Sequence, residues 1–499
     1  MLQNENSNIS LKDIYFLMNN PNKIKLTDST KKRITQSYDR VQKMALSKKA
    51  IYGINTGFGP LCTTKVSPKE TKSLQEKLLL SHSVGVGNPI TPDLSKLMLI
   101  CKIQSLSKGY SGIRLEVLDR LIYFLQNNLT PLVPEKGSVG ASGDLAPLAH
   151  LFLPLIGSGF FWDGKKKIDA KTVLKNHKIK PFTLHAKEGL ALINGTQFIL
   201  AHAIKAVSKL DYLMDLADLI AAMSLEGFQG SLAPFNEELH ELRPFAGNKK
   251  VARRIRELLK NSQNSDSHKD CDRVQDPYSI RCVPQVHGAS RNALSHVQEL
   301  VDIEINSVTD NPIIIDDNTA ISGGNFHGQP LAIAIDYLKI AAAEIGNISD
   351  RRSYLLLEGL HGLPAMLTEN PGLNSGFMIT QYTTAALVSE NKSLCFPSSA
   401  DSIPTGMGQE DHVSMGSISG RKCLEVINNL EKILAIELLH SAQALEFRRP
   451  NKFSLAIEKT LTLVRKNVKI LKQDRVLSDD INTITILIED QAFNVYPEL

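Results

Sequence analysis

The spacing of apolar side chains predicts a chain built mainly from long helices. Between residues 424 and 447, apolar positions recur at steps of three and four, which places them on one face of a helix. Residues 331–348 are apolar on almost all sides, and such a helix is usually buried in a bundle core or a subunit interface. Two further helices are expected at 209–223 and 291–308. We therefore expect a mainly α fold dominated by a large helical bundle.

The N-terminal part follows a different pattern, in which many glycines and prolines interrupt short segments. Short strand signals occur at 313–315 and 319–321. We expect two domains, a smaller one of mixed structure at 1–205 and a long-helix bundle at 206–499. Long polar segments are typical of loops at 260–275 and 397–408.

The composition is that of an ordinary globular protein. Of 499 residues, 42% are hydrophobic and 22% are charged, which excludes wholesale disorder and a collagen-like chain. The net charge of +5 is spread over the whole length without a dense basic stripe, so we expect no nucleic-acid partner.

The compartment is predicted from targeting signals and cysteines. The polar N-terminus lacks the basic start and apolar core of a signal peptide. The longest apolar stretch, 151–162, is too short to span a bilayer, so no membrane association is expected. Six sparse cysteines without a CxxC pair indicate a reduced, cytoplasmic protein.

The most unusual segment is 137–150, GSVGASGDLAPLAH, in which glycines precede an apolar helical pattern. One interpretation is a tight turn before a helix. A phosphate loop fits poorly, since neither GxxxxGK[ST] nor a dinucleotide GxGxxG is present. A third interpretation makes Ala141, Ser142 and Gly143 a reactive triad. In a tight curl the Gly143 nitrogen can approach the Ala141 carbonyl carbon, because small residues permit this approach.

Cyclisation of this triad, with loss of water and of the Ser142 hydroxyl, would give a methylidene-imidazolone (MIO) ring. Such a ring carries an exposed electrophilic methylene made from the chain itself. The tripeptide alone is too common to decide between the interpretations, so the neighbouring motifs carry the weight. They are 52–59 YGINTGFG, 188–197 EGLALINGTQ, 275–288 QDPYSIRCVPQVHG, 310–312 DNP, 323–330 GGNFHGQP and 409–415 QEDHVSM.

With these strings the chain resembles the aromatic amino acid ammonia-lyases, and within them the histidine-specific enzymes, from about residue 51 to about residue 450. The resemblance implies a helical-bundle homotetramer whose active sites are assembled from several subunits. It also implies an autocatalytic MIO formed from Ala141, Ser142 and Gly143, with no external cofactor. The activity implied is deamination of L-histidine to urocanate, the first step of histidine degradation. An electrophile that captures the substrate would divide a difficult elimination into easier steps.

The resemblance also gives roles to single residues, each with a structural alternative. Tyr52 resembles the catalytic base, or is a packing tyrosine. Arg281 is suited to clamp the substrate carboxylate, because guanidinium pairs with carboxylates in a bidentate way, or it forms a surface or structural ion pair. Asn194 offers a donor and an acceptor beside the MIO or the substrate amine, or belongs to a turn. Tyr278 and Phe326 line the cavity, with Tyr278 helping MIO formation, or pack in a core.

Three residues bear on the choice of substrate. His82 suits an imidazole or a phenol, and Glu410 favours an imidazole because a carboxylate accepts its N–H. Gln409 belongs to the same polar lining. Alternatively, His82 is a core histidine and Glu410 is a carboxylate at the start of a helix. Residues 406–408, Gly-Met-Gly, depart from the run expected in many histidine enzymes, which puts the loop geometry in question.

Other functions remain as rivals. A related lyase or aminomutase acting on tyrosine or phenylalanine would share most motifs, and an inert helical scaffold would need none. The fumarase-type lyases share the bundle, but their GSSxMPxKxN-like signature is absent. Metal binding is not expected, because the thirteen histidines show neither HExxH nor a Cys/His ligand spacing.

Overall fold

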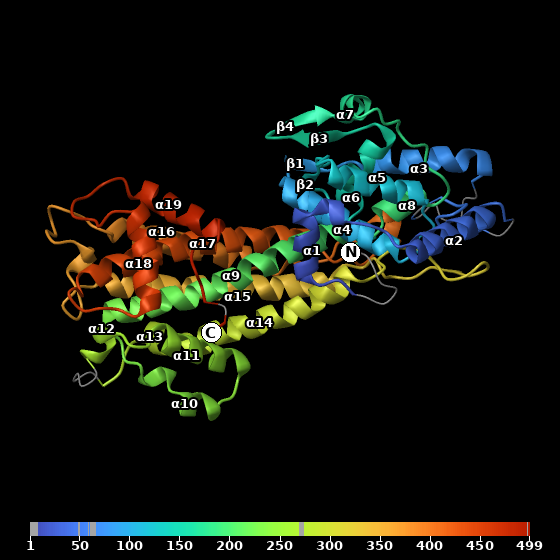
Figure 1. Cartoon of the computed structure of the whole chain (residues 1–499). Coiled ribbons are helices and arrows are strands. Elements are labelled where there is room, and N and C mark those ends of the chain that lie inside the picture. Colours follow the sequence, from blue (N-terminus) through green and yellow to red (C-terminus); the bar gives the residue numbers. More distant parts are fainter. Residues whose placement is uncertain (1–7, 48–49, 58, 60–65, 269–273, 497) are drawn as a thin grey trace. The chain divides into compact units, whose positions relative to one another are not determined.

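The computed structural model describes residues 8–47, 50–57, 59, 66–268, 274–496 and 498–499 (Figure 1). Helices outnumber strands throughout this part of the chain. The helices up to the first long one are α1 (Leu11–Asn19), α2 (Asp28–Ala45), α3 (Pro68–His82), α4 (Pro92–Ser107), α5 (Leu115–Gln126), α6 (Leu145–Phe152), α7 (Ala170–Asn176), α8 (Glu188–Ile193) and α9 (Gln197–Phe228). They are followed by α10 (Glu237–Glu241), α11 (Ala246–Leu258), α12 (Gln263–Asp266), α13 (Tyr278–Arg281), α14 (Val283–Ile305), α15 (Gln329–Leu357), α16 (Met378–Leu394), α17 (Gly416–Glu446), α18 (Leu455–Asn467) and α19 (Leu477–Glu489). The strands are β1 (Val86–Pro89), β2 (Pro134–Lys136), β3 (Phe160–Asp163), β4 (Lys166–Asp169), β5 (Ile313–Ile314) and β6 (Ala320–Ile321).

Contacts divide the chain into two compact units. Unit 1 comprises Met1–Lys205, Gln298–Asp336 and Pro397–Arg421, and unit 2 comprises Ala206–Val297, Tyr337–Phe396 and Lys422–Leu499. Two late segments therefore pack with the N-terminal residues, a return that chain order alone does not reveal. The division into domains 1–205 and 206–499 stays a prediction.

Unit 1 is a cluster of short helices with three small antiparallel ribbons, β1–β2, β3–β4 and β5–β6. Helix α4 is buried over most of its circumference and so lies in the core of the unit. The β3–β4 hairpin and α7 stand together in Figure 1, and Phe160 pairs with Asp169 in the hairpin. The ribbon β5–β6 pairs Ile313 with Ile321, which confirms the two strand signals there.

Unit 2 is built from the long helices, and buried charges join them. Asp218 of α9 accepts hydrogen bonds from Arg254 of α11 (2.9 Å) and from Arg291 of α14. Arg352 of α15 binds Glu437 of α17 through two hydrogen bonds, of 2.5 and 2.9 Å. Burial alone would raise the pKa of Asp218, but the charge of Arg291, with those around it, outweighs burial and holds it below its usual range. The ion pairs therefore offset a desolvation cost that each charge alone would incur.

The four predicted long helices are confirmed, and each one starts earlier than its periodicity indicates. They correspond to α9, α14, α15 and α17. The prediction of a loop at 260–275 was wrong in part, because Ser262 caps the short helix α12 there and residues 269–273 lie outside the described part. The loop predicted at 397–408 contains two short 3-10 helices, Ser398–Ala400 and Gly406–Gly408.

Helices α15 and α16 of unit 2 each carry exposed apolar side chains. Tyr337 and Ile340 of α15 are each 47% exposed, and Ile379 and Tyr382 of α16 are 57% and 59% exposed. Residues 331–348 were predicted to be buried on nearly all sides. The exposed side chains of Tyr337 and Ile340 are therefore the part of this helix that the single chain leaves uncovered. None of the helices that the structure describes combines the length and apolar character needed to cross a bilayer.

Candidate active site

The triad Ala141, Ser142 and Gly143 occupies a tight turn between β2 and α6 in unit 1. The Gly143 N–H donates to the carbonyl of Gly140 (3.3 Å), which closes the turn. Ser142 has φ +49° and Gly143 has φ +83°, so two successive residues adopt the left-handed conformation. A non-glycine residue rarely does this, and such strain persists only where the surroundings impose it.

Gly195, which follows Asn194 in the segment 194–197, imposes this geometry. Its N–H donates to the Ser142 carbonyl (3.1 Å), and its own carbonyl accepts from the Asp144 N–H (2.8 Å). A Cβ added to Gly143 would lie 2.1 Å from the Gly195 carbonyl oxygen, so only glycine fits at this point of contact. The turn is therefore pressed against segment 194–197.

Asn194 is buried beside this contact. Its Nδ2 donates to the carbonyl of Asn311 (2.9 Å), while its Oδ1 is buried and has no hydrogen-bond partner among the described residues. A buried acceptor without a donor is costly, and such an atom is expected where a ligand or reactive group supplies the donor.

Asp144, the N-cap residue of α6, anchors the other end of the triad. Its Oδ2 accepts from the backbone N–H groups of Phe198 and Ile199, at 3.0 Å each. Burial raises the pKa of Asp144 to about 7, although these two hydrogen bonds act in the opposite direction. The start of α9 and the start of α6 are thereby held together around the triad.

Tyr52 lies in a turn after α2, in the same unit. Its neighbour Gly53 packs so closely on Leu190 of α8 that an added Cβ would lie 2.3 Å from the Leu190 Cδ2, and 3.4 Å from the Cδ of Pro312. The tyrosine turn therefore contacts the helix that leads into Asn194 and the segment that binds the Asn194 side chain. Tyr52 itself is half-buried.

The two residues predicted to choose the substrate influence each other. His82 ends α3 and is half-buried, and burial lowers its pKa although the charge of Glu410 opposes this shift. Glu410 Oε2 accepts from the Thr405 hydroxyl (3.3 Å), and its Oε1 lies 3.9 Å from the position of a Cβ on Gly59. Gln409 beside it is exposed.

Phe326 is connected to the segment of Gln409 and Glu410 through its neighbour His327. The ring of His327 stacks on that of His412 (centroids 6.0 Å apart), and its Nε2 lies 3.1 Å from the His412 carbonyl oxygen. The turn that holds half-buried Phe326 is therefore tied to the segment that holds Gln409 and Glu410.

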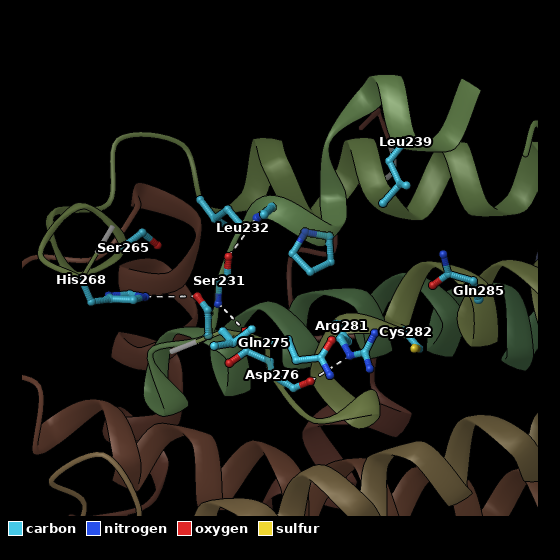
Figure 2. Close-up of a pocket in the computed structure, with 14 residues that line it drawn as sticks. Ser231, Leu232, Leu239, Ser265, His268, Gln275, Asp276, Arg281, Cys282 and Gln285 are labelled. Carbon is cyan, nitrogen blue, oxygen red and sulfur yellow. Dashed lines mark hydrogen bonds between the residues drawn. The ribbon is translucent and has the colours of Figure 1, made fainter. Parts of the chain in front are cut away.

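Tyr278 and Arg281 belong to unit 2, on the one-turn helix α13. The Arg281 Nε donates to the Asp276 carbonyl (2.9 Å), and its guanidinium lies 4.5 Å from the Tyr278 ring centroid. Arg281 lines a cavity of about 620 Å³ together with Asp276, His268 and Gln285 (Figure 2). Tyr278 is 71% exposed, which is unusual for an aromatic side chain with only a structural role.

The residues around the triad fit an MIO group. A turn of small residues is held curled by segment 194–197, in which Asn194 carries an unpartnered amide oxygen. In the described ranges, no three His, Cys, Asp or Glu side chains converge as a metal site would require.

Comparison with known proteins identifies the family. A family model for aromatic amino acid lyases matches residues 9–466. The chain belongs to this family. This lyase is 44% identical to the histidine ammonia-lyase of Symbiobacterium thermophilum over 486 residues, 97% of this chain and 96% of the relative. It is 45% identical to that of Alkaliphilus oremlandii, over 96% and 95% of the two chains.

Solved structures give the same result for the fold. The histidine ammonia-lyase of Trypanosoma cruzi matches this lyase with a TM-score of 0.89 at 42% identity, over 97% of this chain and 92% of that one. A tyrosine aminomutase from Streptomyces globisporus matches with a TM-score of 0.92 at 33% identity, over 98% and 96%. The predicted family and the mainly α bundle are confirmed, and the protein is a carbon–nitrogen lyase.

The sequence did not single out several residues that hold the site. Gly195 and Asp144 lie inside quoted motifs but received no role. Lys102, which binds the Asn194 carbonyl, was missed altogether. The signal was available, because a lysine in the middle of the apolar run LMLICKIQSL conflicts with its surroundings.

Proposed function

We propose that this lyase removes ammonia from L-histidine and releases trans-urocanate, the first step of histidine degradation. The observation that carries the proposal is the strained triad turn pressed against Gly195 beside the unpartnered oxygen of Asn194. Glu410, whose charge acts on His82, supports histidine as the substrate.

The triad is proposed to become the MIO without an external cofactor. The Gly143 nitrogen bonds to the Ala141 carbonyl carbon, whose oxygen leaves as one water, and the Ser142 hydroxyl leaves with its α-hydrogen as a second water. The resulting group supplies an electrophile for the substrate. Asn194 Oδ1 would accept an N–H beside it, because that oxygen is otherwise buried without a donor.

Tyr52 is proposed as the base that takes the β-proton of the substrate. A free phenol has a pKa of about 10, so it acts at neutral pH only where hydrogen bonds or positive charge favour the phenolate. The turn that holds half-buried Tyr52 is fixed on α8 through Gly53, and a fixed turn reduces the orientational cost of proton transfer.

Glu410 and His82 are proposed to hold the imidazole, with Gln409 and Phe326 completing the lining. A carboxylate accepts the imidazole N–H and favours the charged form of the imidazole. Beside a phenyl ring, the same carboxylate would lose its hydration without gaining a hydrogen-bond partner. Burial lowers the pKa of His82 and so favours the neutral imidazole, in which one ring nitrogen donates a hydrogen bond and the other accepts one.

Arg281 and Tyr278 are proposed to complete an active site contributed by more than one copy of the chain, with Arg281 as the clamp for the substrate carboxylate. The proposed assembly is a homotetramer. The exposed side chains of Tyr337, Ile340 and Tyr382 support it, since exposed apolar surfaces of this kind mark subunit contacts. The protein is proposed to act in the cytoplasm, and none of its four described cysteines forms a disulfide.

The test incubates the purified protein separately with L-histidine, L-tyrosine and L-phenylalanine and follows the absorbance of each conjugated product. We expect urocanate only, and none from Ser142→Ala. A coumarate or cinnamate signal instead would retain the lyase chemistry and contradict the substrate, in line with the aminomutase likeness. No product, together with no loss of two waters in the intact mass, would favour the inert scaffold.

A pair of variants tests the specificity argument. Glu410→Gln removes the charge, and Asp411→Asn removes the neighbouring exposed one. We expect kcat/KM for histidine to fall about 10- to 100-fold in the first variant only, as loss of a charged hydrogen bond of about 1.5–3 kcal/mol implies. Equal effects in both would contradict a direct role of Glu410.

A further inference from the structure

A lysine is buried in the core of unit 1, behind the proposed site. Lys102 lies in the middle of α4, is 1% exposed, and has buried Cys101 and Ile103 as neighbours. Its Nζ donates to the Asn194 carbonyl (2.6 Å) and approaches the Gln197 Oε1 at 3.5 Å. Both acceptors belong to segment 194–197.

The charge of Lys102 is poorly compensated. The acid that raises its pKa most, Asp310, is already bound by Lys187 at 2.5 Å. In the described part of the chain, no carboxylate forms an ion pair with Lys102. Burial therefore lowers the pKa of Lys102 to about 7, with Asp310 and Asp144 acting against this shift and Lys187 acting with it. A methionine would fill this place without that cost, so the amine is retained for what it binds.

What Lys102 binds is the segment that shapes the site. The Asn194 backbone is fixed by Lys102 and its Nδ2 by the Asn311 carbonyl, while its Oδ1 is buried without a partner among the described residues. One residue further on, Gly195 contacts Ser142 and Asp144. Gln197 is held on its other side, because its Nε2 donates to Thr309 (2.9 Å).

We propose that Lys102 is a positioning residue, whose buried amine holds the Asn194 carbonyl and Gln197 and so keeps segment 194–197 against the triad with the Asn194 amide oxygen directed at the reacting group. The proposal rests on the proposed function and adds a residue to it. Lys102 acts through Asn194 and touches neither the triad nor a substrate.

The experiment compares Lys102→Met with Lys339→Met. Lys339 is a second fully buried lysine, in unit 2, whose Nζ donates to the Phe396 carbonyl (3.3 Å). It therefore reports the general effect of removing a buried lysine. Intact mass gives the fraction of chains that have lost two waters and so carry the MIO. KM is measured for each variant, and kcat is expressed per chain that carries the MIO.

For Lys102→Met we expect incomplete water loss and a kcat about 10- to 100-fold lower, with KM changed far less, because a small displacement of a catalytic contact affects the rate more than binding. Lys339→Met keeps full water loss and the wild-type kcat. In the double variant Lys102→Met/Asn194→Ala, kcat falls no further than in Asn194→Ala alone, because Lys102 affects kcat through the position of the Asn194 side chain, which is already absent.

A wild-type kcat and full water loss in Lys102→Met would overturn the proposal, as would additive losses in the double variant. The milder Lys102→Gln is prepared in parallel. If neither Lys102 variant folds while Lys339→Met does, Lys102 is a folding residue and the proposal fails. If the wild type acts on tyrosine instead of histidine, only the substrate assignment fails, and the Lys102 and Lys339 variants are then compared with tyrosine as the substrate. If the wild type gives no product and shows no water loss, both the proposed function and the proposed role of Lys102 are overturned.

Discussion

A methyl group added at Gly195 should prevent MIO formation, although Gly195 is not part of the triad. The residue has φ +127°, a conformation that other residues scarcely adopt. A Cβ there would lie 2.6 Å from the Thr309 Oγ1 and 2.8 Å from the Gln197 Oε1. These two side chains are hydrogen-bonded to each other, so neither can move away freely.

The cost can be worked out from these contacts. The backbone conformation costs about 1–3 kcal/mol for a residue other than glycine. Overpacking adds about 1–3 kcal/mol, because two contacts lie below any normal Cβ distance. Gly195→Ala should therefore strain segment 194–197 by about 2–6 kcal/mol. That is enough to release the segment from the triad without unfolding the rest of the unit.

The control is Gly164→Ala in the turn between β3 and β4. Gly164 has φ +59°, and nothing lies within 4 Å of an added Cβ, so only the backbone cost applies. Intact mass and thermal unfolding are measured for both variants. We expect Gly195→Ala to keep both waters and Gly164→Ala to lose them as the wild type does. Full water loss in Gly195→Ala would refute the account of how the turn is held.

Three further outcomes follow from unit 2. Burial lowers the pKa of His440 to about 3, so below about pH 6.5 the unfolded chain binds a proton that the folded chain does not yet bind. The free energy of unfolding should therefore fall by up to about 1.4 kcal/mol for each unit by which the pH is lowered between these two values. His440→Gln, which keeps a donor to Thr380, should flatten this slope in pH-dependent denaturant unfolding. Asp218→Asn removes the carboxylate that the buried guanidinium groups of Arg254 and Arg291 share and leaves them, among the carboxylates of the described residues, Asp215 alone, so it should lower the free energy of unfolding by about 3–5 kcal/mol in the same assay; an unchanged midpoint would contradict the role of the ion cluster. The double variant Tyr337→Asp/Ile340→Asp should give a smaller assembly than the wild type in sedimentation, and an assembly of unaltered size would show that these two exposed residues are not the subunit contact.

Much of the fold was predictable because periodicity is a local property. The apolar spacing between 424 and 447 located α17, and that between 331 and 348 located α15. The helix ends were not predictable, since the polar residues at the start of α14 and α17 join the helices through tertiary contacts. The β3–β4 hairpin was also missed, because β3 continues a longer apolar run and β4 begins with two lysines, so neither gives an alternating apolar pattern.

The candidate site was predictable as far as its motifs reach. The strings GASGD and QEDH led to the triad and Glu410, and the structure places them in one unit with Tyr52, His82, Asn194 and Phe326. What the motifs did not reveal is how the site is held. Lys102 and Asn194 are 92 residues apart in the chain, and their contact exists only through packing. The lysine in an apolar helix broke the local pattern, and such breaks are expected at functional positions.

The most direct measurement of the central claim is the stoichiometry of the reaction with L-histidine. Urocanate and ammonium released by the wild-type protein are quantified in the same sample, beside Ser142→Ala. Under the proposed function, the wild type releases equal amounts of the two products and the variant releases neither. Ammonium without urocanate, or urocanate from a protein whose Ser142 has been removed, would contradict it.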